Sequence, residues 1–339
     1  MASSEQIGGD AKVCSTAGFG YLFRPALGGF HPASPRVEIR MSSTASANNA
    51  PTADAGSEMG SSRLVALRTE LDRIDDAMHD LLMQRAEVVA QVATTGKGRV
   101  ALRAGREAAI IRRLLARHTG PLPRHSLVRL WRELLAATTS MQGSYVIAVC
   151  DTDPAGGFTQ ATREHFGALT PVHVHRSPAQ ALTEIAAGTA SVAVLPLPQE
   201  SEAPRDAWWT ALLQKDEPRI HVLARLPFWA PRPEGTSTVQ ALVVGAVAPD
   251  ATDHDRSLLG IELALDVSRT RLTTALTTAG FEPGTVILRR DPGAPVAHAL
   301  ADVAGHVTQA DPRLAAMQSV LHRPVVLGAY AVPVNGIVK

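Results

Sequence analysis

The chain contains few cysteines, few aromatic residues and little net charge. Its 339 residues include two cysteines, Cys14 and Cys150. Two cysteines exclude a disulfide framework or a cysteine-based zinc site, and they fit a reducing compartment such as the cytoplasm. Aromatic residues make up 4% of the sequence, and no apolar run approaches the length of a membrane span. With 45% hydrophobic and 19% charged residues, the sequence predicts a soluble protein of two or three domains with no membrane partner.

The net charge of +1 is unevenly distributed. Residues 63–142 contain fourteen Lys and Arg against eight Asp and Glu, which leaves the rest of the chain mildly acidic. A basic segment raises the hypothesis of nucleic-acid binding. Its one aromatic residue, Trp131, stands at an apolar helical position, and no helix-turn-helix pattern is present. We therefore expect no nucleic-acid partner.

Apolar residues within residues 63–142 recur at steps of three and four. The first such pattern runs from Leu64 to Val92 and predicts one long amphipathic helix. At about 100° per residue, Arg68 and Arg85 lie about 260° apart around this helix. One helix therefore cannot point both arginines into the same pocket, unless a second copy of the helix takes part.

Two further helical patterns follow. One opens at Arg106-Glu107, and the other runs from Leu127 to Leu135. Thr138 and Gln142 stand four residues apart at the end of the last pattern, which predicts that they share one helix face. Three helices with these polar residues predict an all-helical anion site.

In this order, the residues of the three helices resemble those of the all-helical chorismate mutases. The matching positions, in chain order, are Leu67-Arg68, Leu81-Leu82-Met83-Gln84-Arg85, Arg106-Glu107, Thr138 and Gln142. The resemblance implies a three-helix domain that forms an intertwined homodimer, in which Arg68 reaches into the partner's site. It also implies a pericyclic rearrangement of chorismate to prephenate, which requires no cofactor and no metal.

The resemblance further implies a role for each residue. Arg is suited to a dicarboxylate because its planar guanidinium binds a carboxylate through two hydrogen bonds. Donors aimed at the ether oxygen would stabilise the charge that builds there as its bond breaks. The implied roles are carboxylate binding for Arg68, Arg85, Arg106 and Thr138, donation to the ether oxygen for Lys97 and Gln142, and acceptance from the ring hydroxyl for Glu107.

Two positions depart from the family pattern. Gly96 occupies the position of the family lysine, so Lys97 can serve only if the helix ends or bends at the neighbouring glycines. Arg103 stands where the family has an acidic residue in the loop before the second helix. We interpret the other arginines of the segment as solvated or structural, namely Arg112, Arg113, Arg117, Arg129 and Arg132.

Outside the helical segment, three further regions are expected. Residues 1–60 are rich in Ala, Ser and Gly, and residues 42–62 are of low complexity, which predicts a disordered tail before a mutase domain at 61–143. Met41 and Met59 are alternative start sites. Residues 144–236 alternate between strand and helix patterns. The expected elements are strands at 145–150, 172–174 and 191–195 and helices at 159–166 and 178–187.

Residues 144–236 resemble the prephenate dehydratase domain, of the periplasmic-binding-like α/β type. The resemblance rests on the loop Asp153–Phe158 and the strand Val194–Leu197. The chemistry residues are missing, because Pro198-Gln199-Glu200 replaces Glu-Asn-Ser and Ala224-Arg225-Leu226 replaces Thr-Arg-Phe. We therefore expect a degenerate domain without dehydratase activity. His173 and His175 alternate along a strand, and we interpret them as strand surface rather than metal ligands.

Residues 237–339 predict a small α+β domain. Strands are expected at 241–246, 285–288 and 325–331, and helices at 269–279 and 295–303. The segment Val326–Tyr330 resembles the end of the ACT regulatory domain, although the effector motif of that family is absent. The sequence thus predicts a multidomain α and α/β protein.

Three functions stay open at the level of sequence. The leading hypothesis is a cytoplasmic, dimeric chorismate mutase of aromatic amino-acid biosynthesis, with chorismate as its small-molecule partner. The second is a bifunctional mutase and dehydratase, which the alanine at position 224 disfavours. The third is a non-catalytic, ligand-binding regulatory protein, which the retained set of site residues disfavours.

Overall fold

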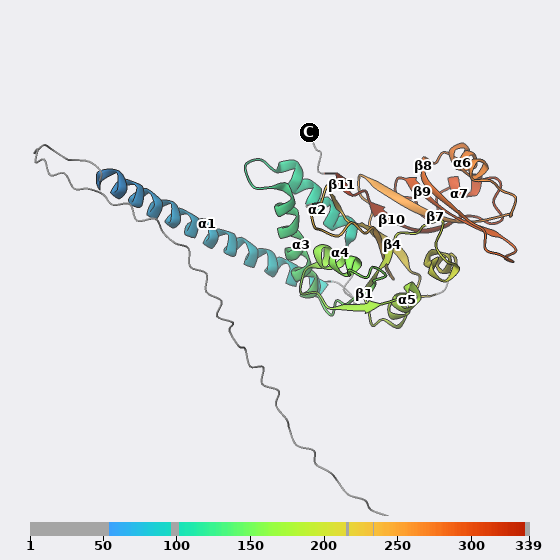
Figure 1. Ribbon diagram of the computed structural model, residues 1–339, viewed down its shortest axis with the longest axis horizontal. Helices are drawn as coiled ribbons and strands as arrows, with labels where there is room; N and C mark the ends of the chain where they lie inside the picture. The colour runs from blue at the N-terminus through green and yellow to red at the C-terminus, as the bar shows by residue number, and fades with distance from the viewer. Residues whose placement is uncertain (1–53, 96–101, 215–216, 233, 336–339) are drawn as a thin grey trace, which may run out of the picture. The chain divides into compact units, whose positions relative to one another are not determined.

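The computed structural model describes residues 54–95, 102–214, 217–232 and 234–335. The chain divides into two compact units, Met1–Leu67 and Arg68–Lys339. Helix α1, Asp54–Thr95, begins in the first unit and continues into the second (Figure 1). Cys14 and Lys97 lie outside the described residues.

The start of α1 corrects the expected boundary of the tail. A disordered tail was expected up to residue 60, but the helix begins at Asp54. Ala55, Glu58 and Met59 have high helix propensity, and they extend the amphipathic helix by almost two turns. This preference was not recognised in the sequence because the stretch is of low complexity. The earlier part of the expected tail lies outside the described residues.

Helices α2, Ala104–Arg117, and α3, Arg124–Ser140, confirm the second and third helical patterns. The buried side chains of α2 recur at steps of three and four and pack against α3. Phe228 and Ala331, from distant parts of the chain, complete this core. Helix α3 ends at Ser140, so Gln142 lies in the turn that follows and not on the helix itself.

The rest of the second unit is built on one nine-stranded sheet, in the order β2-β1-β3-β6-β4-β10-β7-β9-β8 (Figure 1). Its strands are β1 Ile147–Cys150, β2 Val172–His175, β3 Val192–Pro196, β4 His221–Leu226, β6 Ala241–Gly245, β7 Asp255–Leu263, β8 Pro283–Arg289, β9 Ala297–Ala304 and β10 Val325–Ala331. Strands β5, Trp229–Ala230, and β11, Val334–Asn335, form a separate pair. The remaining helices are α4 Gly157–Phe166, α5 Pro178–Ala187, α6 Arg269–Thr278, α7 Arg313–Ala316 and two short 3-10 helices, Pro204–Asp206 and Trp208–Leu213.

The first strands are covered on both faces. In β1, Ile147 and Val149 belong to the core cluster that includes residues of α4, whereas Ala148 and Cys150 belong to the cluster that includes α5 and the second 3-10 helix. Because successive side chains of a strand point to opposite faces, this alternation places α4 and α5 on opposite sides of the sheet. The strand and helix patterns expected between residues 145 and 195 are confirmed.

Residues 255–331 follow the order β7-α6-β8-β9-α7-β10 and pair as β10-β7-β9-β8, all antiparallel. This is the ferredoxin-like βαββαβ arrangement. The helix expected at 295–303 is wrong, because Ala297–Ala304 is strand β9. Its four alanines favour helix locally. Pairing with β7 on one side and β8 on the other outweighs that preference.

The sheet continues across the expected domain boundary at residues 236 and 237. Strand β6 follows this boundary in sequence but lies between β3 and β4, antiparallel to both. Strand β10 then pairs in parallel with β4. No helix among the described residues combines the length and apolar character needed to cross a bilayer.

Candidate functional site in the helical segment

Arg85 joins α1 to α3. Its Nη1 donates to Thr138 Oγ1 at 3.1 Å, and its guanidinium lies 5.8 Å from the centroid of the Trp131 ring. Both partners are on α3. They are seven residues apart, which is about two turns, so they lie on the same face of the helix. The structure therefore brings together two of the expected site residues, Arg85 and Thr138, which are 53 positions apart in sequence.

Arg106 adds a second positive charge beside Arg85. Burial lowers the pKa of Arg85, the charge of Arg106 lowers it further, and the nearby carboxylate of Glu107 opposes both effects. Arg106 itself is exposed at the start of α2. An anion held between the two positive charges would offset their mutual repulsion.

Glu107 accepts a hydrogen bond from Arg132 Nη1 at 3.0 Å. The two side chains are 12% and 5% exposed, and the Arg132 guanidinium lies 4.9 Å from the centroid of the Phe228 ring. Burial raises the pKa of Glu107, while Arg132 and Arg85 oppose that rise. Arg132 was interpreted as solvated or structural. The structure confirms the structural interpretation, because the side chain is buried and fixes Glu107.

Thr138 and Gln142 lie together as expected. The Thr138 hydroxyl accepts from Arg85 and donates to the Leu134 carbonyl at 2.9 Å, so both the donor and the acceptor capacity of this buried group are used. The Gln142 amide Nε2 donates to the Thr138 carbonyl at 3.2 Å. Gln142 is exposed beyond the end of α3, which leaves its side chain free to turn towards a ligand.

Arg68 does not join this group within one chain. At about 1.5 Å of rise per residue, it lies about 26 Å along α1 from Arg85. An arginine side chain is far shorter than this distance, so the Arg68 of one chain cannot contact a ligand held by the Arg85 of the same chain.

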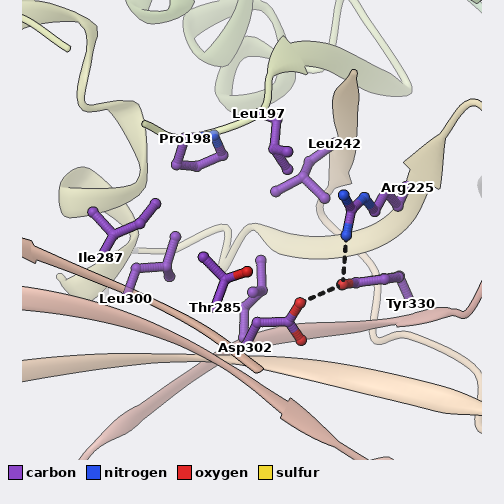
Figure 2. Close-up of a pocket in the computed structure, with 10 residues that line it drawn as sticks. Leu197, Pro198, Arg225, Leu242, Thr285, Ile287, Leu300, Asp302 and Tyr330 are labelled. Carbon is purple, nitrogen blue, oxygen red and sulfur yellow. Dashed lines mark hydrogen bonds between the residues drawn. The ribbon is translucent and has the colours of Figure 1, made fainter. Parts of the chain in front are cut away.

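A cavity of about 60 Å³ is lined by Pro198 and Arg225. These two residues belong to the segments that stand in place of the dehydratase motifs Glu-Asn-Ser and Thr-Arg-Phe. Figure 2 shows Arg225 of β4 and Tyr330 of β10 beside the apolar Leu197 and Pro198, which follow β3. Arg225 Nη1 donates to Tyr330 Oη at 3.4 Å, and Tyr330 donates to Asp302 at 2.8 Å. Arg225, Tyr330 and Asp302 are therefore connected in one chain of hydrogen bonds. Ala224, beside Arg225, is buried and contributes no hydroxyl.

The loop before α4 is closed by its own carboxylates. Asp153 Oδ2 accepts from the backbone N–H of Gly157 at 3.1 Å, and Asp151 Oδ2 accepts from that of Thr159 at 2.9 Å. Gly156 adopts a φ of 73°, in the left-handed region that favours glycine. Because two carboxylates occupy the start of this helix, the loop resembling Gly-Pro-x-Gly-Thr-Phe does not offer its N–H groups to an anion.

His173 and His175 lie on edge strand β2, as the strand-surface interpretation predicts. Both rings contact the carboxylate of Glu184 on α5, at 2.8 and 3.0 Å. The described part of the chain contains no group of three or more His, Cys, Asp or Glu residues that could hold a metal ion.

Comparison with known proteins finds similarity in the helical segment. Residues 67–143 match chorismate mutase type II. A bifunctional chorismate mutase/prephenate dehydratase of Pseudomonas aeruginosa is 28% identical over 174 residues, which are 47% of this chain and 47% of the relative. A protein of the same name from Neisseria gonorrhoeae is 34% identical over 108 residues, covering 31% of this chain and 28% of the relative. The match thus spans about half the length of the Pseudomonas aeruginosa relative and 28% of the Neisseria gonorrhoeae relative.

Among solved structures, prephenate dehydratase from Streptococcus mutans aligns over 56% of this chain and 98% of its own, with a TM-score of 0.41 and 17% identity. The sequence match and the arrangement of Arg85, Glu107 and Thr138 refer to the same three helices. The similarity to chorismate mutase type II extends over residues 67–143.

Proposed function

We propose that the helical segment, residues 61–143, converts chorismate to prephenate. The observation that carries the proposal is the hydrogen bond that holds the Arg85 guanidinium on Thr138. Burial lowers the pKa of Arg85, and the positive charge of Arg106 lowers it further. A dicarboxylate substrate would compensate both guanidiniums. Holding such a substrate in its reactive, folded conformation accelerates a unimolecular rearrangement without a nucleophile, a proton transfer or a cofactor.

The roles of the remaining residues follow from their contacts. Thr138 fixes the Arg85 guanidinium through its hydroxyl. Arg132 holds Glu107, which is then positioned to accept from the ring hydroxyl of the substrate. Gln142 and Lys97 are proposed as donors to the ether oxygen, where negative charge develops in the transition state.

We further propose a homodimer in which Arg68 binds the substrate of the partner chain. The distance along α1 separates Arg68 from the Arg85 of its own chain. In the second unit, α1 exposes a long apolar stripe that one chain leaves uncovered. Its members are Leu71, Ile74, Met78, Leu81, Leu82, Val88 and Val92. Pairing with a second copy of α1 would bury this stripe and bring each Arg68 to the other site.

For residues 144–236 and 237–339 we propose a degenerate dehydratase-like and an ACT-like region without dehydratase activity. Ala224 lacks a hydroxyl, Arg225 is engaged by Tyr330, and Asp151 and Asp153 occupy the start of α4. We place the protein in the cytoplasm, in the pathway to phenylalanine and tyrosine.

A bifunctional mutase and dehydratase is the second candidate. The 174 residues matched in the Pseudomonas aeruginosa relative, which bears that name, exceed the length of the helical segment. This candidate requires an acid or hydroxyl group in place of the missing threonine. In the cavity lined by Arg225, the side chains of Thr285, Tyr330 and Asp302 carry such groups.

One assay distinguishes the two candidates. Purified full-length protein is incubated with chorismate, with and without EDTA, and the products are identified. We expect prephenate to accumulate at the same rate in both conditions. Arg85→Ala should abolish the reaction, whereas Arg113→Ala, at an exposed position of α2, should not change it. Phenylpyruvate formed at neutral pH above the non-enzymatic rate would favour the bifunctional candidate, and no loss of chorismate would contradict both.

A further inference from the structure

A cavity of about 630 Å³ lies between α3, α4 and the segment that follows β4. Its lining includes neither Arg85 nor Thr138. Arg129 and Arg132 line it from α3, Arg163 lines it from α4, and Phe228 and Trp229 line it from the segment after β4. A volume in this range is typical of small-molecule sites.

The lining carries an excess of positive charge. Four arginines line the cavity, against two glutamates, Glu133 and Glu164. Both glutamates are already engaged, because Glu133 accepts from the backbone N–H of Ala168 and Glu164 pairs with Arg232. Arg163 donates to the neutral carbonyl of Ala168. The positive charges of Arg129 and Arg163 are therefore not balanced by these acids.

Two of the arginines are placed to act together. Arg129 and Arg132 are three residues apart on α3, so their side chains lie one turn from each other on the same face. Arg129 is exposed, whereas Arg132 is only 4% exposed and held in place by Glu107. A guanidinium has five N–H donors, and Glu107 accepts from Nη1 of Arg132. One buried and one exposed guanidinium on the same helix face can bind a carboxylate together.

The floor of the cavity is aromatic. Phe228 is 6% exposed, and its ring lies beneath the Arg132 guanidinium. Trp229 is half-buried beside it. His165 also lines the cavity, and burial together with the charge of Arg132 keeps its pKa well below the usual value, so the ring is neutral. A flat apolar group can therefore pack here without burying a second charge.

We propose that this cavity binds a small aromatic carboxylate, with the carboxylate held by Arg129 and Arg132 and the ring packed against Phe228 and Trp229. None of the residues proposed to contact chorismate lines this cavity, although Arg132, which does, also holds Glu107. Binding is measured without chorismate, so the proposal can succeed or fail independently of the mutase activity.

Benzoate is the probe, and its neutral isostere benzamide is the control for charge. Binding to the full-length protein is measured by isothermal titration calorimetry. We expect benzoate to bind at least about tenfold more tightly than benzamide, as for a charge-assisted contact. Arg129→Ala should weaken benzoate binding by about the same factor. Arg113→Ala removes an exposed arginine of α2 outside the cavity and should leave the affinity unchanged.

Three outcomes would overturn the proposal. Equal affinities for benzoate and benzamide would remove the role of the arginines. An affinity for inorganic phosphate equal to that for benzoate would remove the role of the aromatic floor. Benzoate binding that is lost in Arg106→Ala but kept in Arg129→Ala would place the anion at the mutase site instead of this cavity.

Discussion

Glu107 of α2 and Arg132 of α3 form an ion pair of 3.0 Å that is almost closed to solvent. Burial lowers the pKa of Arg132 to about 10, and Glu107 opposes this effect. A pKa of about 10 leaves Arg132 charged at neutral pH, so each partner provides the charge that the other requires. This pair connects the proposed chorismate site, which includes Glu107, to the cavity that Arg132 lines.

Removing one member of the pair should destabilise the protein strongly. Arg132→Ala leaves the buried carboxylate of Glu107 without its partner, and such a change typically costs about 3 to 5 kcal/mol. Arg129→Ala, one turn away and exposed, should change the free energy of unfolding by about 0.5 kcal/mol or less. Urea denaturation of both variants measures the difference. Equal stabilities would mean that the pair contributes little.

The sequence alone could not distinguish Arg132 from Arg129. Both stand on the polar side of the same helical pattern, and local spacing gives them the same environment. The difference comes from Glu107 and Phe228, which are distant in sequence and meet Arg132 only in the fold. The family resemblance indicated Arg85 and Thr138 as carboxylate-binding residues, whereas the hydrogen bond between them is known only from the structure.

Elements with a strong local pattern were predicted well. Helix α5 has the bounds expected for it, because Ser177 caps its first turn through its side chain and Gly188 ends it in the left-handed region. Strand β9 was mistaken for a helix, and β7 was not predicted. Both strands are paired on two sides, so partners from elsewhere in the chain determine them. Gly260 also interrupts the apolar pattern of β7. Glycine is required there because a side chain would collide with Leu213.

Substitutions in the proposed site should lower mutase activity without loss of fold. Arg106→Ala should cost about 3 to 5 kcal/mol of transition-state binding, because it removes a charge partner of the substrate. Gln142→Ala should cost about 3 kcal/mol, as loss of an oxyanion donor does. Values of kcat/KM for chorismate measure both effects, with Arg113→Ala as the control. Activity close to that of the unmodified chain in both variants would exclude these residues from the site.

The identity of residue 142 should determine the pH profile. A glutamine donates a hydrogen bond at any pH, whereas a glutamate must be protonated to donate. The chain should therefore stay active across neutral pH, and Gln142→Glu should shift the optimum to acid. The measurement is kcat/KM between pH 5 and 9. A variant with the profile of the unmodified chain would show that residue 142 does not contact the ether oxygen.

The proposed contribution of Arg68 to the partner site can be tested by subunit mixing. Arg68→Ala and Arg106→Ala chains should each be inactive. In a heterodimer, one site carries both substitutions and the other carries neither, so about half of a dimer's activity should return. A tagged chain and native mass spectrometry establish that exchange has occurred. Heterodimers without recovered activity would mean that Arg68 acts within its own chain.

His165 should make the stability of the fold depend on pH. Its ring is 8% exposed, and burial, followed by the charge of Arg132, holds its pKa well below the usual value. In the unfolded chain this histidine takes up a proton as the pH falls through about 6.5, whereas in the folded chain it stays neutral. The contribution of His165 is therefore fully present above that pH and is lost as the pH falls below it. The slope of the free energy of unfolding against pH should be at most about 1.4 kcal/mol per pH unit.

His165→Gln, which cannot be protonated, should remove this part of the slope in urea denaturation between pH 7 and 5. His125→Gln, at an exposed position of α3, provides the matched control. If the two variants have the same slope as each other, the buried ring is not the source of the pH dependence.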